Sequence, residues 1–428
     1  MKKKYRIILY TSIFLLCVVA SIILVVKKSN SVYGEESKPK VVKHKSMLSM
    51  NLEQTAGAGD YKTVTQSKWP TEGYKFNAEL SRCENGSTLS WDDTKKAVIV
   101  SGNLSDKCYV YFDIYQPTLA EYIKSQYTGT QGENNIYYHD SDLANGAGDN
   151  SYRYAGANPN NFVCFGSDTS PCPTDNLYRI IGVFGENYHG VTGKQLVKLI
   201  KYDYMTTDEL GTDGDYSQTY KEWGMDSTYK GTYGDGERIG VYYWNYKATN
   251  SATNTWSTSL LNKTNLNTNF INNIGKTWAN KIATVTWKVG GNTYANISQS
   301  VPATTYQNEI VNPVTTNTTD NATTYSAKIG LMYVSDYGFA ASPDAWTLTM
   351  SSYNNTTVTN NNWMYMGLYE WTISRIADHS NNAFIVLGDG VRGDGVNLSD
   401  GVRASFSLES SVSYVSGSGS MSDPIVIN

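Results

Sequence analysis

The chain of 428 residues has few charged side chains, few histidines and few cysteines, and each shortage narrows what the protein can be. Charged residues make up 17% of the sequence, and the net charge of -4 leaves no basic excess that would attract a nucleic acid. With four histidines and five cysteines, the sequence shows no zinc-binding or Ser-His-Asp pattern. We therefore expect no nucleic-acid partner, no metal or other cofactor, and no enzymatic activity.

Aromatic residues are abundant by contrast, at 13% of the chain with 34 tyrosines and 10 tryptophans. Such a chain can bury enough apolar surface to offset the entropy lost on folding, so disorder is excluded. The length predicts two or three domains.

Long hydrophobic runs are also scarce, and the clearest one spans residues 7–26, between "MKKKYR" and Lys27-Lys28. Twenty helical residues span roughly 30 Å, the thickness of the hydrocarbon layer of a membrane. We expect residues 1–28 to form a cytoplasmic tip and an uncleaved signal anchor, with 29–46 as a polar linker. A cleaved signal peptide is the alternative, but its apolar region is usually shorter and ends in an A-x-A-like site, which does not follow here.

Four cysteines lie outside the apolar run, and an even number in two local pairs favours disulfides in an oxidising exterior. We predict the bridges Cys83–Cys108 and Cys164–Cys172, with the other connectivities left open. Zinc is the alternative, but there is no C-x-x-C spacing or nearby pair of histidines. Lysines flank the apolar run on both sides, so charge does not predict the orientation of the helix in the membrane. The paired cysteines do, and we expect a single-pass protein of the cell membrane with its C-terminal ectodomain outside.

Residues 47–115 contain short β-branched or alternating runs separated by turn signals such as Asn85-Gly86, which predicts a small antiparallel β-domain stapled by a disulfide. Residues 116–174 read as a connecting helix that begins near Pro117, followed by a disulfide loop. Within that segment Asp140, Asp142, Asn145 and Asp149 raise the question of calcium. Ala144 breaks the EF-hand template, and we favour a solvated loop.

Residues 175–428 begin with two buried-looking strands, "LYRIIGVFG" and "QLVKLIKYD", followed by a helix-like segment, "TWSTSLLNKTNLNTNFIN". The strand candidates "AKIGLMYVSDYGFA" and "YEWTISR" come next, and then a "GVR" ending. This order of segments resembles a bacterial surface-domain family of unknown function with a C-type-lectin-like fold, a fold also found in formylglycine-generating enzymes and in the variable proteins of retroelements. Ala404 stands where that family usually has proline. The expected fold class is α+β: a transmembrane helix, the small β-domain and a larger C-type-lectin-like domain.

The resemblance implies a scaffold that displays binding loops and buries its motif residues. Framework roles fall on Trp371, Arg375 and Arg403, with Arg403 paired to a carboxylate or bonded to backbone. The candidate binding loops are polar, tyrosine- and asparagine-rich stretches in 351–363 and 376–382. The residues singled out in them are Tyr353, Asn354, Asn360, Asn361, Trp363 and Asn381.

Binding of an extracellular protein or glycan is the expected function, in adhesion or display, and the alternative is a structural protein of the cell envelope. An enzyme is the least favoured interpretation, because His189 and His379 lack a catalytic motif and nothing marks the surroundings of Glu309 and Glu370. The stretch "GDGVRGDGVNLSDGVR" contains three Asp-Gly steps that resemble turns, and its Arg392-Gly393-Asp394 tripeptide is a weak adhesion motif.

Overall fold

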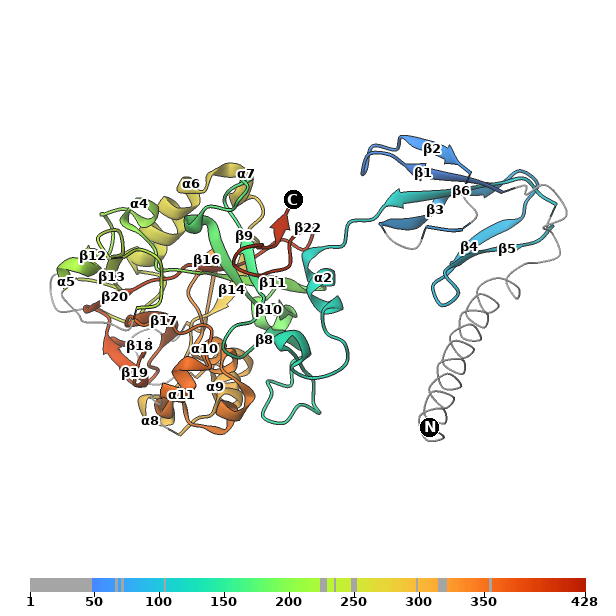
Figure 1. Cartoon of the computed structure of the whole chain (residues 1–428). Helices are drawn as coiled ribbons and strands as arrows, with labels where there is room; N and C mark the ends of the chain where they lie inside the picture. The colour runs from blue at the N-terminus through green and yellow to red at the C-terminus, as the bar shows by residue number, and fades with distance from the viewer. Residues whose placement is uncertain are drawn as a thin grey trace, which may run out of the picture. The chain divides into compact units, whose positions relative to one another are not determined.

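The computed structural model of the chain describes residues 48–428 except 66–67, 71–72, 104, 224–228, 235, 248–251, 298, 315–321 and 354–355. It is an α+β protein built mostly of strands and small sheets (Figure 1). The chain divides into two compact units, unit 1 up to Gln116 and unit 2 from Pro117 to Asn428. No helix in the described ranges is long and apolar enough to cross a membrane, and the run expected to do so, 7–26, lies outside them.

Unit 1 contains a four-stranded sheet in the order β2-β1-β6-β3 and a separate β4-β5 hairpin. The prediction of an antiparallel domain was wrong in one pair, because β1 and β6 run parallel. The long stretch of chain between these two strands allows β1 to pair in parallel with β6. The strands are β1 (Leu48–Glu53), β2 (Tyr61–Val64), β3 (Tyr74–Cys83), β4 (Thr88–Asp92), β5 (Ala97–Ser101) and β6 (Cys108–Ile114).

The core of unit 1 is small, and the predicted disulfide joins two neighbouring strands of its sheet. Cys83 and Cys108 are bonded between the paired ends of β3 and β6. In this core the Phe112 ring packs edge-on against Trp91 at 5.6 Å and Phe76 at 5.9 Å. A domain with so little core gains much of its stability from a covalent cross-link.

Unit 2 holds two larger sheets, in the orders β16-β21-β11-β10-β8-β7 (with β9 also on β10) and β12-β13-β20-β17-β18-β19. The expected strands "LYRIIGVF" and "LVKLIK" are β10 and β11, both buried along their whole length. The strands are β7 (Ile136–His139), β8 (Ser151–Tyr154), β9 (Phe162–Cys164), β10 (Leu177–Phe184), β11 (Leu196–Lys201), β12 (Tyr216–Thr219), β13 (Gly240–Tyr243), β14 (Val285–Lys288), β15 (Thr324–Ala327), β16 (Ile329–Gly330), β17 (Glu370–Arg375), β18 (Asn382–Leu387), β19 (Gly390–Gly395), β20 (Ser399–Gly401), β21 (Ser405–Ser407), β22 (Tyr414–Ser416) and β23 (Val426–Ile427).

Short helices lie at two ends of these sheets, with α4, α6 and α7 at one end and α8 to α11 at the other in the view of Figure 1. The α-helices are α2 (Leu119–Ser125), α3 (Glu186–His189), α4 (Thr207–Leu210), α5 (Tyr220–Trp223), α6 (Ile271–Asn273), α7 (Gly275–Ala279), α8 (Tyr294–Ile297), α9 (Pro302–Tyr306), α10 (Val334–Ala340) and α11 (Thr356–Asn360). Two further elements are π-helices, η4 (Leu261–Phe270) and η5 (Gln307–Val311). The 3-10 helices are η2 (Glu133–Asn135), η3 (Thr174–Asn176), η6 (Pro343–Thr347) and η7 (Met350–Ser352).

The segment expected as a connector, 116–174, packs into unit 2 from Pro117 onward. Its helix α2 buries Leu119 and Ile123 in the unit 2 core, and its first turn is closed by a reciprocal capping pair of Thr118 and Glu121. The second predicted disulfide, Cys164–Cys172, is also present and closes a short loop next to β9.

The Asp-Gly stretch is strand rather than turn at two of its three steps. Only the first step lies at a turn: Gly388 and Asp389 connect β18 to β19, and Gly390, which begins β19, has φ +117°. Asp394 lies in β19 and Asp400 in β20, so the interpretation of all three steps as turn chemistry was wrong there. The ladder hydrogen bonds of the sheet outweigh the turn preference of an Asp-Gly pair.

Candidate ligand-binding surface

The loop between β17 and β18, residues 376–381, is held in place by one buried side chain. Asn254 is 1% exposed, and its Nδ2 donates to the carbonyls of Ile376 at 2.9 Å, His379 at 2.6 Å and Asn382 at 2.8 Å. Its backbone N–H donates to the Ser380 carbonyl at 2.8 Å. These bonds fix the loop backbone before any ligand arrives.

Four exposed side chains gather on this loop and on the neighbouring helix α8: Tyr294, Asp378, His379 and Asn381, which we call the 378 surface. The carboxylate of Asp378 accepts the backbone N–H of Tyr294 at 2.8 Å and lies 3.2 Å from Nδ1 of His379. The Tyr294 ring meets the His379 ring edge-on at 5.7 Å and is 52% exposed. Of the loop residues predicted from sequence, Asn381 belongs here.

The Arg392-Gly393-Asp394 tripeptide lies beside this surface but is built into a sheet. All three residues pair with β18, and Arg392 forms an ion pair with Asp389. A Cβ at Gly393 would stand 3.0 Å from the Tyr294 ring, so glycine permits the close packing of α8 on β19. An extended strand bonded along its length is not the projecting loop that an adhesion tripeptide needs, which leaves this motif as part of the framework.

The other predicted binding loop, 351–363, turns its aromatic residues inward. Tyr353 is fully buried and donates its hydroxyl to the carbonyls of Gly338 and Ala345, and Trp363 is 3% exposed. Their selection as binding residues was wrong. The polar neighbours in the sequence suggested an exposed loop, but burying a large aromatic side chain stabilises the fold enough to turn these two rings into the core. Asn360 is exposed, Asn361 is half-buried, and Asn354 lies outside the described residues.

The three residues predicted to have framework roles are buried, Trp371 and Arg375 in β17 and Arg403 just before β21. Trp371 is inaccessible and donates its indole N–H to the Tyr242 carbonyl at 2.8 Å. The Arg403 guanidinium contacts the Glu370 carboxylate at 2.9 Å and donates to the Met364 carbonyl. Arg375 is 1% exposed and ends β17, directly before the loop of the 378 surface.

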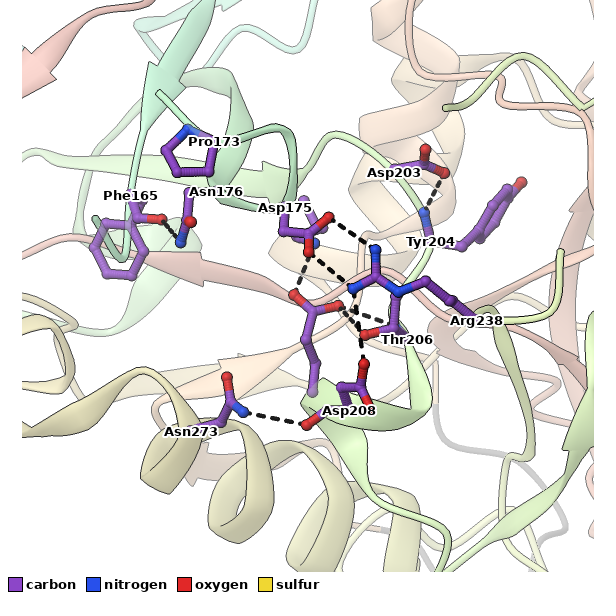
Figure 2. A network of polar contacts seen from close by, with 12 residues as sticks. Phe165, Pro173, Asp175, Asn176, Asp203, Tyr204, Thr206, Asp208, Arg238 and Asn273 are labelled. Atoms are coloured by element: carbon purple, nitrogen blue, oxygen red, sulfur yellow. Dashed lines mark hydrogen bonds and ion pairs between the residues drawn. The ribbon is translucent and has the colours of Figure 1, made fainter. Parts of the chain in front are cut away.

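Figure 2 shows a second polar network, formed in part by residues that follow the C-terminal end of β11. The Arg238 guanidinium lies 2.8 Å from Asp175 and 3.7 Å from Asp208, with 47% of its side chain exposed. Asp208 lies in the first turn of α4, whose N-terminus is capped by the reciprocal pair of Thr206 and Glu209. The half-exposed Arg238 side chain therefore links η3 to α4. Because two carboxylates already neutralise its charge, it would attract an anionic ligand only weakly.

The aspartate-rich loop considered for calcium is closed by its own hydrogen bonds. Asp140 accepts the backbone N–H groups of Asp142 and Leu143, and Asp149 pairs with the buried Arg153 at 2.7 Å. Within the described part of the chain, no group of three or more His, Cys, Asp or Glu could hold a metal ion. Burial lowers the pKa of His139 well below its usual value, so this ring is a neutral part of the core.

Sequence reasoning missed a group of buried ionisable side chains that includes Glu309, for which no special surroundings were expected. Glu309 is 1% exposed and accepts the backbone N–H groups of Val334 and Ser335, close to the buried pair of Lys198 and Asp336. The available signal was a lysine in the middle of the apolar run "QLVKLIK", since lysine is rarely buried without a partner.

Comparison of the chain with protein-family models, with curated proteins and with solved structures found no match.

Proposed function

We propose that the protein is anchored in the cell membrane by its N-terminal segment, that unit 2 has a C-type-lectin-like fold, and that unit 2 binds an extracellular ligand. The observation that carries the proposal is the 378 surface: exposed aromatic, imidazole, carboxylate and amide groups on a loop that the buried Asn254 holds at three carbonyls. Groups held in place before binding lose little entropy when a ligand arrives.

The chemistry of the 378 surface suits a glycan best. The exposed ring of Tyr294 offers an apolar face on which a sugar ring can stack, and Asp378 and Asn381 offer hydrogen-bonding groups to hydroxyls. The two disulfides support an extracellular location, because such bonds persist in an oxidising compartment.

The test is binding of the full-length protein, kept oxidised, to an array of glycans and surface proteins. We expect a specific glycan signal that Tyr294→Ala lowers at least tenfold, since loss of one stacked ring removes on the order of 1–3 kcal/mol. The matched control is Tyr115→Ala, an exposed tyrosine of unit 1. A protein that binds no array member and only associates with itself would instead be a structural component of the envelope.

The location has its own test, protease added to intact cells. Outside the membrane, the exposed loops of unit 2 would be cut while a cytoplasmic marker protein stays whole. Complete resistance in intact cells, followed by cleavage after lysis, would place the protein inside and contradict the proposal.

A further inference from the structure

A lysine and an aspartate contact each other in the interior of unit 2, and neither belongs to the 378 surface. Nζ of Lys198, on β11, lies 2.6 Å from Oδ2 of Asp336, on α10, and the two side chains are 1% and 0% exposed. They are 138 residues apart along the chain. Two groups held so close without water have the proximity that an intramolecular reaction needs.

Aromatic rings enclose the amine. Its nitrogen lies 4.2 Å from the ring centroid of Tyr333, 4.8 Å from that of Tyr188 and 5.0 Å from that of Trp287. Burial lowers the pKa of Lys198, while Asp336 opposes the shift. Desolvation therefore raises the share of the neutral amine, which is the nucleophilic form.

Donors hold the carboxyl group of Asp336. The Tyr188 hydroxyl donates to Oδ1, and the backbone N–H of Tyr333 donates to Oδ2 at 2.9 Å. If the amine adds to the carboxyl carbon, the Tyr188 hydroxyl would stabilise the negative charge that develops on Oδ1, while Oδ2 is the oxygen that departs as water.

A second buried carboxyl group lies beside this pair. Glu309 accepts the backbone N–H groups of Val334 at 3.2 Å and Ser335 at 2.9 Å, which directly precede Asp336. Burial, with a smaller contribution from the charge on Asp336, raises the pKa of Glu309 to about 7. A carboxyl group with such a pKa can both accept and return a proton at neutral pH.

We propose that Lys198 and Asp336 are joined in the folded protein by an amide bond between Nζ and Cγ, with Glu309 as the proton carrier. A proton moves from the ammonium to the carboxylate, and the neutral amine attacks Cγ to form the new C–N bond. Glu309 takes a proton from the nitrogen and returns it to the departing hydroxyl. The C–O bond breaks and one water leaves, so the condensation needs no oxidant or co-reactant.

The chain contains a comparison for this chemistry. Lys201, three residues further along β11, is also buried and lies 2.7 Å from Glu209. Glu209, however, is 13% exposed and caps α4 through Thr206. Solvent at that carboxylate opposes the loss of water, and we expect Lys201 and Glu209 to remain an ion pair.

The test is mass spectrometry of the full-length protein, purified, reduced, alkylated and denatured. We expect a chain lighter than its sequence by one water and, after proteolysis, a branched peptide that joins the segments of Lys198 and Asp336. Processing of the N-terminus would change the mass of the intact chain, so the branched peptide is the observation that shows the cross-link. Separate, unmodified peptides for both segments in the wild-type protein would overturn the proposal.

Variants assign the roles. Lys198→Arg should have no bond and its full mass, whereas Lys201→Arg should keep the loss of water. Asp336→Asn should give the same branched product by losing ammonia instead. Glu309→Gln should slow formation after synthesis on the order of 100-fold, the contribution of one general acid–base group. A cross-link that forms at the wild-type rate in Glu309→Gln would remove Glu309 from the mechanism.

Discussion

At the scale of single residues, unit 2 keeps several ionisable side chains away from water, and two of its buried arginines each lie against a carboxylate. Arg403 pairs with Glu370, and Arg153 pairs with Asp149. Removing one member of such a pair leaves an uncompensated charge in a medium that solvates it poorly, which is more damaging than never having had the pair.

Arg403→Ala is therefore expected to destabilise unit 2 by about 3–5 kcal/mol. The double variant Arg403→Met with Glu370→Gln should recover part of that loss, because no buried charge remains. Arg238→Ala, which removes a half-exposed pair, is the control and should change stability by less than about 1 kcal/mol. Denaturant unfolding measures all three, and equal losses for Arg403 and Arg238 would contradict the role of burial.

Glu309 should give unit 2 a stability that depends on pH. Its pKa in the folded state, about 7, lies above the ordinary 4.5, so the folded state binds more protons between these values. Stability from this group is therefore greatest below pH 4.5 and falls as the pH rises towards 7, by roughly 3 kcal/mol in all.

The measurement is the difference in unfolding free energy between wild type and Glu309→Gln at several pH values from 4.5 to 8. We expect the wild type to lose stability relative to the variant as the pH rises. Glu186→Gln changes an exposed glutamate on α3 and should show no such trend. A flat difference for Glu309→Gln would mean that Glu309 titrates normally.

At the scale of elements, the strands with continuous apolar runs could be predicted from sequence, and the polar segments could not. β10 and β11 follow directly from their apolar stretches. The segment "YVSDYGF" was expected as strand but forms α10. The side chain of Asp336 caps the N-terminus of this helix by accepting the backbone N–H of Tyr333. Its β-like composition was overridden by tertiary contacts that no local pattern contains.

Asn254 makes an element-scale prediction possible, because one amide holds a whole loop. Asn254→Ala leaves three carbonyls without that donor and should lower stability by about 1–3 kcal/mol. Amide hydrogen exchange in 376–382 should accelerate more than in the rest of unit 2. Asn381→Ala, at the exposed tip, should leave exchange unchanged, and similar exchange in both variants would refute the clamp.

At the scale of the whole molecule, the cysteine spacing predicted both disulfides, and no residue pattern could predict which charged side chains meet. Cys83 and Cys108 are separated by 25 residues, and Cys164 and Cys172 by 8. Lys198, Asp336 and Glu309 lie on three elements that become neighbours only in the folded unit. The same reason explains why the polar surroundings of Tyr353 and Trp363 suggested exposure for residues that are core.

Each unit has its own core, so each disulfide should support only the unit that contains it. Replacing Cys83 and Cys108 by alanine should destabilise unit 1 by about 2–4 kcal/mol and leave the melting of unit 2 unchanged. Replacing Cys164 and Cys172 is the reciprocal control. Calorimetry resolves the two transitions, and a shift of both by one replacement would show that the units unfold together.

Unit 2 begins and ends at one spot. The Leu119 N–H bonds to the Val412 carbonyl, the rings of Tyr122 and Tyr414 stack at 3.7 Å, and the Asn428 N–H bonds to Ser413. A module whose two ends adjoin can be grafted into a surface loop of another protein without stretching its host. Residues 117–428 are therefore suited to serve as an insertable cassette, and a fluorescent or enzymatic host carrying them should keep its own activity.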